Sequence, residues 1–221
     1  MSTEELPIFP LSNVVLFPRV QTPLHLFEPR YRALARDVLA GERRIGMVTV
    51  PPPHVDEMQG DPPVFPIGCC GVVTESQRLP DGRYNIVLLG EHRFQVTDEP
   101  PRPEDRLYRV ARVQRLEDAY PAAERDRVAR LRERVSRQVV ALVRRIQPER
   151  ADAFDPELFA EVDDATFVNA LSNAFAFPVE EKQNLLDADS IPERFERLEA
   201  VLSFRRAEYE AGGGAGTGRV H

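Results

Sequence analysis

Short apolar segments separated by prolines and glycines run through the first half of the chain, and this pattern predicts β-strands. Proline has no amide donor and breaks helices, so the strands are expected to be short. An Asp-Gly step at residues 81–82 predicts a hairpin turn, because these residues tolerate positive φ. One helix is predicted from Pro29, with Tyr31, Leu34 and Val38 on one face. The candidate strands are residues 6–9, 14–17, 44–50, 67–77, 84–89, 92–97 and 108–116.

The pattern changes after Pro121, where apolar residues recur every three or four positions and predict helices. The longest helix carries Val128, Leu131, Val135, Val139, Leu142 and Ile146. A second helix is expected to begin at a cap formed by Asp164, and a short third one to span residues 179–186. Ser190 and Glu193 form a Ser-x-x-Glu capping box, which predicts the start of a fourth helix.

These two patterns predict an α+β protein in which a small barrel is followed by a helical bundle. Evenly spaced short strands with bends at glycine and proline are typical of a closed or half-closed barrel. We therefore expect a β-rich domain over residues 1–117, a helical domain over residues 118–210 and a flexible glycine-rich tail over residues 211–221.

The composition narrows the range of partners and locations. A net charge of −7 argues against general affinity for nucleic acid or for anionic membranes. No apolar run approaches the ~18 residues of a membrane span, and the N-terminus does not read as a secretory signal. Two adjacent cysteines, Cys69 and Cys70, offer neither a disulfide framework nor a Cys-x-x-Cys zinc motif. We expect a cytoplasmic protein that needs no cofactor or metal.

Four stretches of the chain, taken in order, carry a family resemblance. Residues 6–40 run from two apolar segments into Phe-Glu-Pro-Arg-Tyr, and residues 67–73 form a glycine-punctuated segment, IGCCGVV. Residues 81–94 read DGRYNIVLLGEHRF, and residues 180–195 carry EEKQNLL followed by IPERF. This order resembles the N-terminal, substrate-binding domain of the Lon protease family.

The resemblance implies a PUA-like barrel that engages polypeptide, standing alone without the catalytic domains of Lon. An ATPase of this kind needs a Gly-Lys phosphate loop, and no Gly-Lys pair occurs in the sequence. The family's protease uses a serine activated by a lysine, whereas the sole lysine here, Lys182, lies in the EEKQ segment. We therefore expect a non-catalytic domain of the ATP-dependent protease La family rather than an enzyme.

The predicted partner is unfolded polypeptide or one specific protein, and the oligomeric state is left open. PUA-like barrels elsewhere bind RNA, so a regulatory module for RNA or a small ligand is the alternative, and a peptidase-related enzyme is a third. The candidate polypeptide-binding residues lie where a strand ends and a helix begins, together with two apolar residues of the 51–63 loop: Phe17, Pro18, Arg19, Phe27, Glu28, Arg30, Val55 and Met58.

Each candidate also has a purely structural interpretation. Phe17 is either core or one wall of a peptide groove. Arg30 either pairs with a partner or holds the turn through Glu28. The 51–63 loop either lies over a cleft or is a passive surface excursion. No HxH or HExxH spacing gives the internal histidines His25, His54 and His92 a ligand role, and the cysteines are expected to fill the barrel interior.

Overall fold

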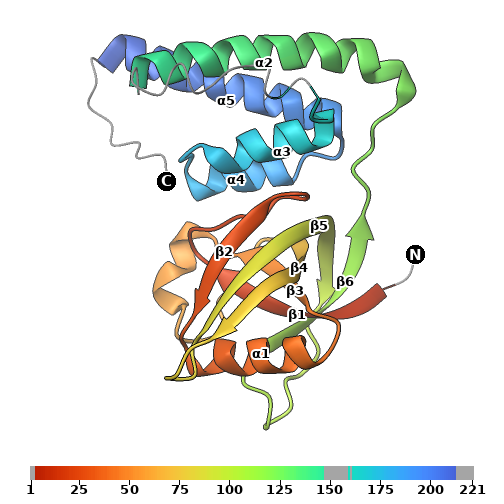
Figure 1. Cartoon of the computed structure of the whole chain (residues 1–221), viewed down its shortest axis with the longest axis vertical. Helices are drawn as coiled ribbons and strands as arrows, with labels where there is room; N and C mark the ends of the chain where they lie inside the picture. The colour runs from red at the N-terminus through yellow and green to blue at the C-terminus, as the bar shows by residue number, and fades with distance from the viewer. Residues whose placement is uncertain (1–2, 147–158, 160, 213–221) are drawn as a thin grey trace. The chain divides into compact units, whose positions relative to one another are not determined.

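The computed structural model describes residues 3–146, 159 and 161–212 of the chain. It forms two compact units (Figure 1). The first comprises Met1–Glu117 and Pro178–Leu186, and the second comprises Asp118–Phe177 and Asp187–His221. The predicted tail lies outside the described residues beyond Gly212. No helix within the described ranges is long and apolar enough to cross a membrane.

The first unit is built on a six-stranded sheet that closes on itself. The strand order is β2-β5-β4-β3-β1-β6, and β5 also pairs with β6. Five strands therefore form a closed ring, and β2 flanks it as an extra strand on β5. Strands β1 and β3 are parallel and the other pairs are antiparallel. The strands are β1 (Thr3–Leu11), β2 (Gln21–Leu26), β3 (Arg44–Thr49), β4 (Ile67–Arg78), β5 (Tyr84–Asp98) and β6 (Arg109–Leu116).

Strand β5 is continuous, although its sequence predicts two strands. Its first half pairs with β2 and its second half pairs with β6, so the strand changes partner near Gly90. A register shift in the β4–β5 pairing lies at the same place, since Cys70 pairs with His92 and Gly71 with Gly90. Glu91 is the extra residue of this β-bulge, and a bulge bends its strand.

The predicted strand at residues 14–17 is wrong, because these residues form no ladder. Val15, Leu16 and Phe17 are buried all the same, so their apolar run reflects a core segment of irregular backbone. Periodicity alone cannot distinguish such a run from a buried strand. The second strand instead begins at Gln21, after the turn at Pro18 and Arg19.

Two helices and a short 3-10 turn complete the first unit: α1 (Pro29–Ala40), α4 (Val179–Leu186) and η1 (Pro52–Glu57). Pro29 opens α1, and Tyr31, Leu34 and Val38 are buried as their spacing predicts. Helix α4, far along the chain, joins the barrel unit through side chains. The Gln183 amide donates to the Ile67 carbonyl at 2.9 Å, and buried Arg93 donates to the Leu186 carbonyl at 3.0 Å.

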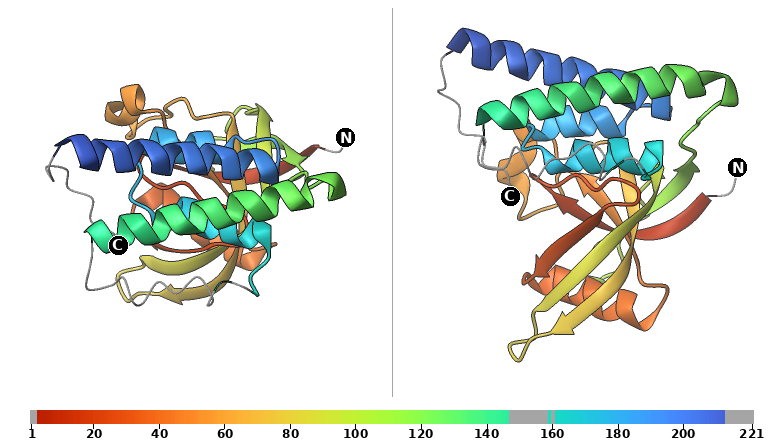
Figure 2. Two further views of the ribbon diagram at one scale, coloured as in Figure 1. Left: turned by 90° about the horizontal axis from the view of Figure 1, so that it is seen from above. Right: turned by 45° about the horizontal axis from the view of Figure 1, so that its top comes forward.

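The second unit consists of α2 (Arg125–Ile146), α3 (Asp164–Ala174) and α5 (Ile191–Gly212), with a short turn η2 (Ala122–Glu124) before α2. Helices α2 and α5 lie side by side (Figure 2). Asp163, rather than Asp164, caps α3 by accepting from the Thr166 amide at 3.1 Å. Ser190 caps α5 by accepting from the Glu193 amide at 3.3 Å, as its sequence predicts.

A buried arginine joins the elements of the second unit. Arg194 on α5 is fully buried and donates to the Asn169 side chain at 2.7 Å and to the Asp118 carboxylate at 2.8 Å. A buried charge is tolerated only when it is paired and hydrogen-bonded. Asp118 supplies the opposite charge to Arg194, and Asn169 supplies a further hydrogen-bond acceptor.

Candidate functional site

The segment at residues 17–20, which the sequence offered either as core or as one wall of a peptide groove, forms a tight turn. The Val20 amide donates to the Phe17 carbonyl at 3.2 Å, Pro18 occupies the second position, and Arg19 has a φ of 64° at the third. These are the features of a type II turn. Phe17 and Pro18 are buried, so neither offers a surface to a partner, and Phe17 is a core residue. Arg19 is exposed.

Arg30 holds the loop between β3 and β4 against the start of α1. Its Nε donates to Glu28 at 3.0 Å, and its guanidinium also donates to the carbonyls of Gly60, at 2.9 Å, and of Met58. The structure thus brings Glu28, Arg30 and Met58 together. These internal acceptors occupy the Arg30 donors, which agrees with the interpretation that Arg30 organises the chain rather than contacting a partner.

Two of the candidate residues expose apolar side chains. Phe27 is 58% exposed just before α1, and Val55 is 38% exposed within η1. The Phe27 ring stacks on the imidazole of His25, with 6.0 Å between ring centroids. Phe27 is the candidate whose apolar side chain is most exposed, and it lies beside a hydrogen-bonding side chain, so it best fits a contact role.

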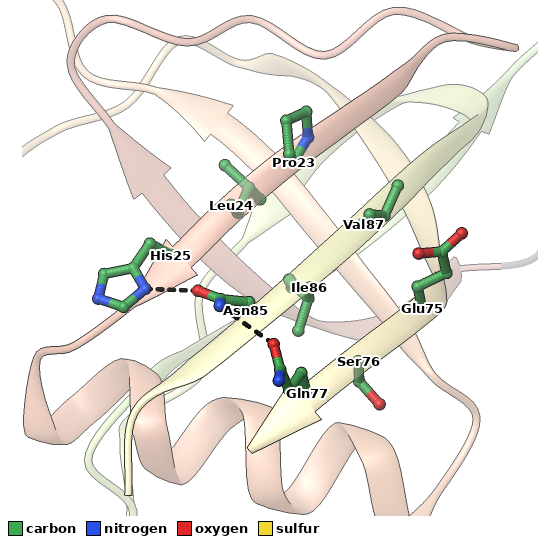
Figure 3. A pocket seen from close by; sticks show the side chains of 9 residues that line it. All are labelled: Pro23, Leu24, His25, Glu75, Ser76, Gln77, Asn85, Ile86 and Val87. Carbon is green, nitrogen blue, oxygen red and sulfur yellow. Dashed lines mark hydrogen bonds between the residues drawn. The ribbon is translucent and has the colours of Figure 1, made fainter. Parts of the chain in front are cut away.

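A shallow hollow of about 390 Å³ adjoins His25 on the outward face of β2, β5 and β4 (Figure 3). Two cross-strand rows line it. His25, Asn85 and Gln77 form one, in which His25 and Asn85 are hydrogen-bonded at 2.7 Å. Pro23, Val87 and Glu75 form the other. The sequence analysis did not identify this hollow, because the register that aligns three strands is a tertiary feature. The signal that the sequence did offer was the alternation of outward-facing and inward-facing residues along each strand.

We call the continuous set Pro23, His25, Phe27, Asn85 and Val87 the β2 surface. It combines apolar contact area with hydrogen-bonding side chains, and it carries no carboxylate of its own. Strand β2 pairs with β5 alone among the strands that the structure describes, which leaves its other edge without a paired strand. Pro23 lacks an amide donor, so that edge is a poor template for a continued ladder, and side chains are the main means of contact.

A second group of reactive side chains lies at the bulge between β4 and β5. Donor atoms of Cys70, Glu91 and His92 all lie within 4.8 Å of one another. Burial, and then the nearby Glu91 carboxylate, raise the pKa of Cys70 to about 12. Burial also lowers the pKa of His92. Both groups are therefore neutral at pH 7, which does not suit a thiolate nucleophile.

The sole lysine lies on α4, where burial lowers its pKa. Helix α4 also carries Gln183, which bonds to the barrel at Ile67, so this helix has a structural role in the first unit.

Comparison with known proteins identifies the family. The model of the ATP-dependent protease La (LON) substrate-binding domain matches residues 5–203. The chain belongs to this family, as the sequence motifs predict. Among curated relatives, the Lon protease of Cytophaga hutchinsonii is 25% identical over 189 residues, which cover 86% of this chain and 23% of that protease. Lon protease 2 of Sorangium cellulosum is 29% identical over 210 residues, 90% of this chain and 24% of that protease. The chain thus spans about a quarter of these relatives' length.

Solved structures confirm the predicted α+β fold. The N-terminal domain of a Mycobacterium avium complex Lon protease superimposes with a TM-score of 0.65 at 17% identity, covering 90% of this chain and 98% of that one. A Lon N-terminal domain protein from Xanthomonas campestris gives a TM-score of 0.58 at 23% identity, covering 91% and 98%. At these identities the likeness concerns the fold. The shared part is the substrate-binding domain and not the ATPase or protease domains.

Proposed function

We propose that this chain is a non-catalytic recognition module that binds polypeptide through the β2 surface. Membership in a substrate-binding family supports a binding role. The observation that carries the assignment to this surface is the exposed Phe27 ring, stacked on a histidine that lines the hollow. An apolar ring beside hydrogen-bonding side chains suits an extended chain that presents both apolar side chains and backbone groups.

The recognised polypeptide is expected to be unfolded, because a hollow this shallow can hold single side chains but not a folded domain's surface. Arg19 and Val55 are the other exposed members of the original candidate set, and we propose them as peripheral contacts. Neither ATP nor the bound chain is consumed in this role.

The test of this proposal compares how tightly the chain binds the native and the unfolded form of one model protein. The chain is titrated with native α-lactalbumin and with the same protein after reduction and carboxymethylation, and binding is followed by fluorescence anisotropy. We expect the unfolded form to bind and the native form not to bind. Binding should persist at ~0.5 M salt, where the Debye length is only about 4–5 Å and exposed charge pairs are screened. Equal binding of both states, or no binding of either, would contradict the proposal.

A further inference from the structure

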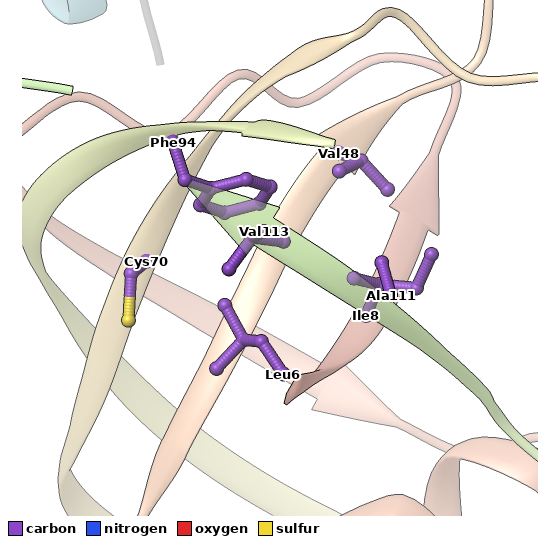
Figure 4. Close-up of a cluster of buried hydrophobic side chains, with 7 residues drawn as sticks. All are labelled: Leu6, Ile8, Val48, Cys70, Phe94, Ala111 and Val113. Atoms are coloured by element: carbon purple, nitrogen blue, oxygen red, sulfur yellow. The ribbon is translucent and has the colours of Figure 1, made fainter. Parts of the chain in front are cut away.

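One end of the barrel interior is lined by charged side chains and by side chains of the types that can ligate a metal. The interior cluster includes Leu6, Ile8, Val48, Cys70, Phe94, Ala111 and Val113 (Figure 4). Because side chains alternate along a strand, the interior positions continue to Glu4 on β1, Arg44 on β3, His92 on β5 and Arg115 on β6. Together with Glu91, these residues form what we call the barrel mouth.

The bulge in β5 explains why three potential ligands meet there. Cys70 pairs directly with His92, and Gly71 pairs with Gly90, which leaves Glu91 without a partner across the ladder. A bulge breaks the strict alternation of side chains and re-aims the extra residue. Glu91 therefore approaches the same point as His92, and its carboxylate lies 3.9 Å from the Cys70 sulfur.

The buried imidazole of His92 has an unused ring nitrogen. His92 is 8% exposed, and within the described part of the chain its Nε2 has no hydrogen-bond partner. The Glu4 carboxylate lies 3.8 Å from Nε2, beyond hydrogen-bonding distance. A buried polar atom without a partner costs free energy unless something occupies it. One ring nitrogen of His92 belongs to the group whose donor atoms lie within 4.8 Å of one another.

We propose that the barrel mouth binds a zinc ion, with the Cys70 sulfur, a ring nitrogen of His92 and the Glu91 carboxylate as ligands. Thiolate, imidazole and carboxylate are the three ligand types that zinc takes in proteins. Ligand atoms around tetrahedral zinc lie about 3.5 Å apart, given metal–ligand bonds of about 2.0–2.3 Å. The group therefore needs to contract by roughly 1 Å, and the exposed Glu91 side chain has the freedom to do so. Glu4 or water supplies the fourth ligand.

The other charges at the barrel mouth modulate this site. Arg44 pairs with Glu91 at 3.2 Å and with Glu4 at 4.0 Å, and it must yield part of this contact to the metal. Its side chain is half-exposed and can turn toward solvent. The Cys70 thiol must release its proton to solvent when zinc binds.

Cobalt substitution of the tag-free full chain tests the site. A cobalt ion bound to Cys70 should give a thiolate-to-cobalt charge-transfer band in the near ultraviolet, and added zinc should abolish it. Cys70→Ser should remove the band. Glu91→Gln, at a more exposed position, should keep the fold and weaken zinc binding by about tenfold or more.

Two matched variants control for folding and for other ligands. Cys69→Ser changes the neighbouring buried cysteine, and His54→Gln changes a histidine outside the barrel mouth; both should keep the band. The proposal is wrong if wild type shows no such band. It is also wrong if the band survives in Cys70→Ser or is lost in Cys69→Ser. Finally, it is wrong if Glu91→Gln is folded, as judged by circular dichroism, and binds zinc as tightly as wild type does.

Discussion

A Cβ atom on Gly90 would lie 2.1 Å from the Phe17 carbonyl oxygen. Gly90 also accepts from the Arg19 amide at 2.7 Å and donates to the Val20 carbonyl at 2.9 Å. The turn before β2 is thereby held directly against β5, at the point where β5 bends. The same contact fixes the start of the β2 surface and the bulge that forms the barrel mouth.

Gly90→Ala should therefore destabilise the barrel strongly. The new methyl group would overlap backbone atoms, which cannot move away as a flexible side chain can, and we expect a loss of more than ~2 kcal/mol in the free energy of unfolding. Urea denaturation measures it. Gly60→Ala is the matched control, because its Cβ would meet its nearest neighbour at an ordinary 3.5 Å. Similar stabilities of the two variants would show that the close approach at Gly90 is not maintained.

Arg194→Ala should destabilise the helical unit by about 3–5 kcal/mol, because it removes the fully buried cation that pairs with the Asp118 carboxylate and donates to the Asn169 side chain. Arg134→Ala removes an ion pair on the surface of the same unit, between Arg134 on α2 and Glu199 on α5. This change should cost less than about 1 kcal/mol. Thermal unfolding of both variants gives the comparison. If the two losses were equal, the Arg194 network would contribute no more than a surface ion pair.

Tyr31 should make the protein less stable in alkali. Burial raises the pKa of Tyr31 to about 12, whereas the unfolded chain loses this proton near pH 10. Between these values the folded state holds the proton and the unfolded state does not, so the free energy of unfolding falls as pH rises. Urea titrations at pH 9 and pH 11 should show this fall, and Tyr31→Phe should reduce it. A pH dependence identical to wild type would indicate that Tyr31 titrates normally when folded.

Local patterns in the sequence predicted most of the helices, because caps, prolines and three-to-four-residue periodicity act over a few residues. The family motifs are likewise short local stretches. Helix α4 and the Ser190 cap are examples. The strand expected at residues 14–17 failed because burial, rather than alternation, explains that apolar run. The β2 surface and the barrel mouth could not be predicted, since each depends on register between strands that are distant in sequence, as with His25 and Asn85 or Cys70 and His92.

The structure places the candidate binding residues in different environments. Phe27 and Val55 are exposed as a contact role requires, whereas Phe17 and Pro18 are buried and the Arg30 donors are used within the chain. The reason is physical: apolar and charged residues at a strand–helix junction serve packing and turn formation as readily as binding, and only burial distinguishes the two uses.

Binding of unfolded α-lactalbumin by two phenylalanine variants tests the central claim most directly. Phe27 on the barrel unit is 58% exposed, and Phe204 on α5 is 57% exposed, so Phe27→Ser and Phe204→Ser remove equally accessible rings from different surfaces. A contact residue at an interface commonly contributes ~1–2 kcal/mol, so Phe27→Ser should weaken binding by about five- to thirtyfold, whereas Phe204→Ser should bind as wild type does. Wild-type affinity in Phe27→Ser, with weakened binding in Phe204→Ser, would contradict the account and place recognition on the helical unit.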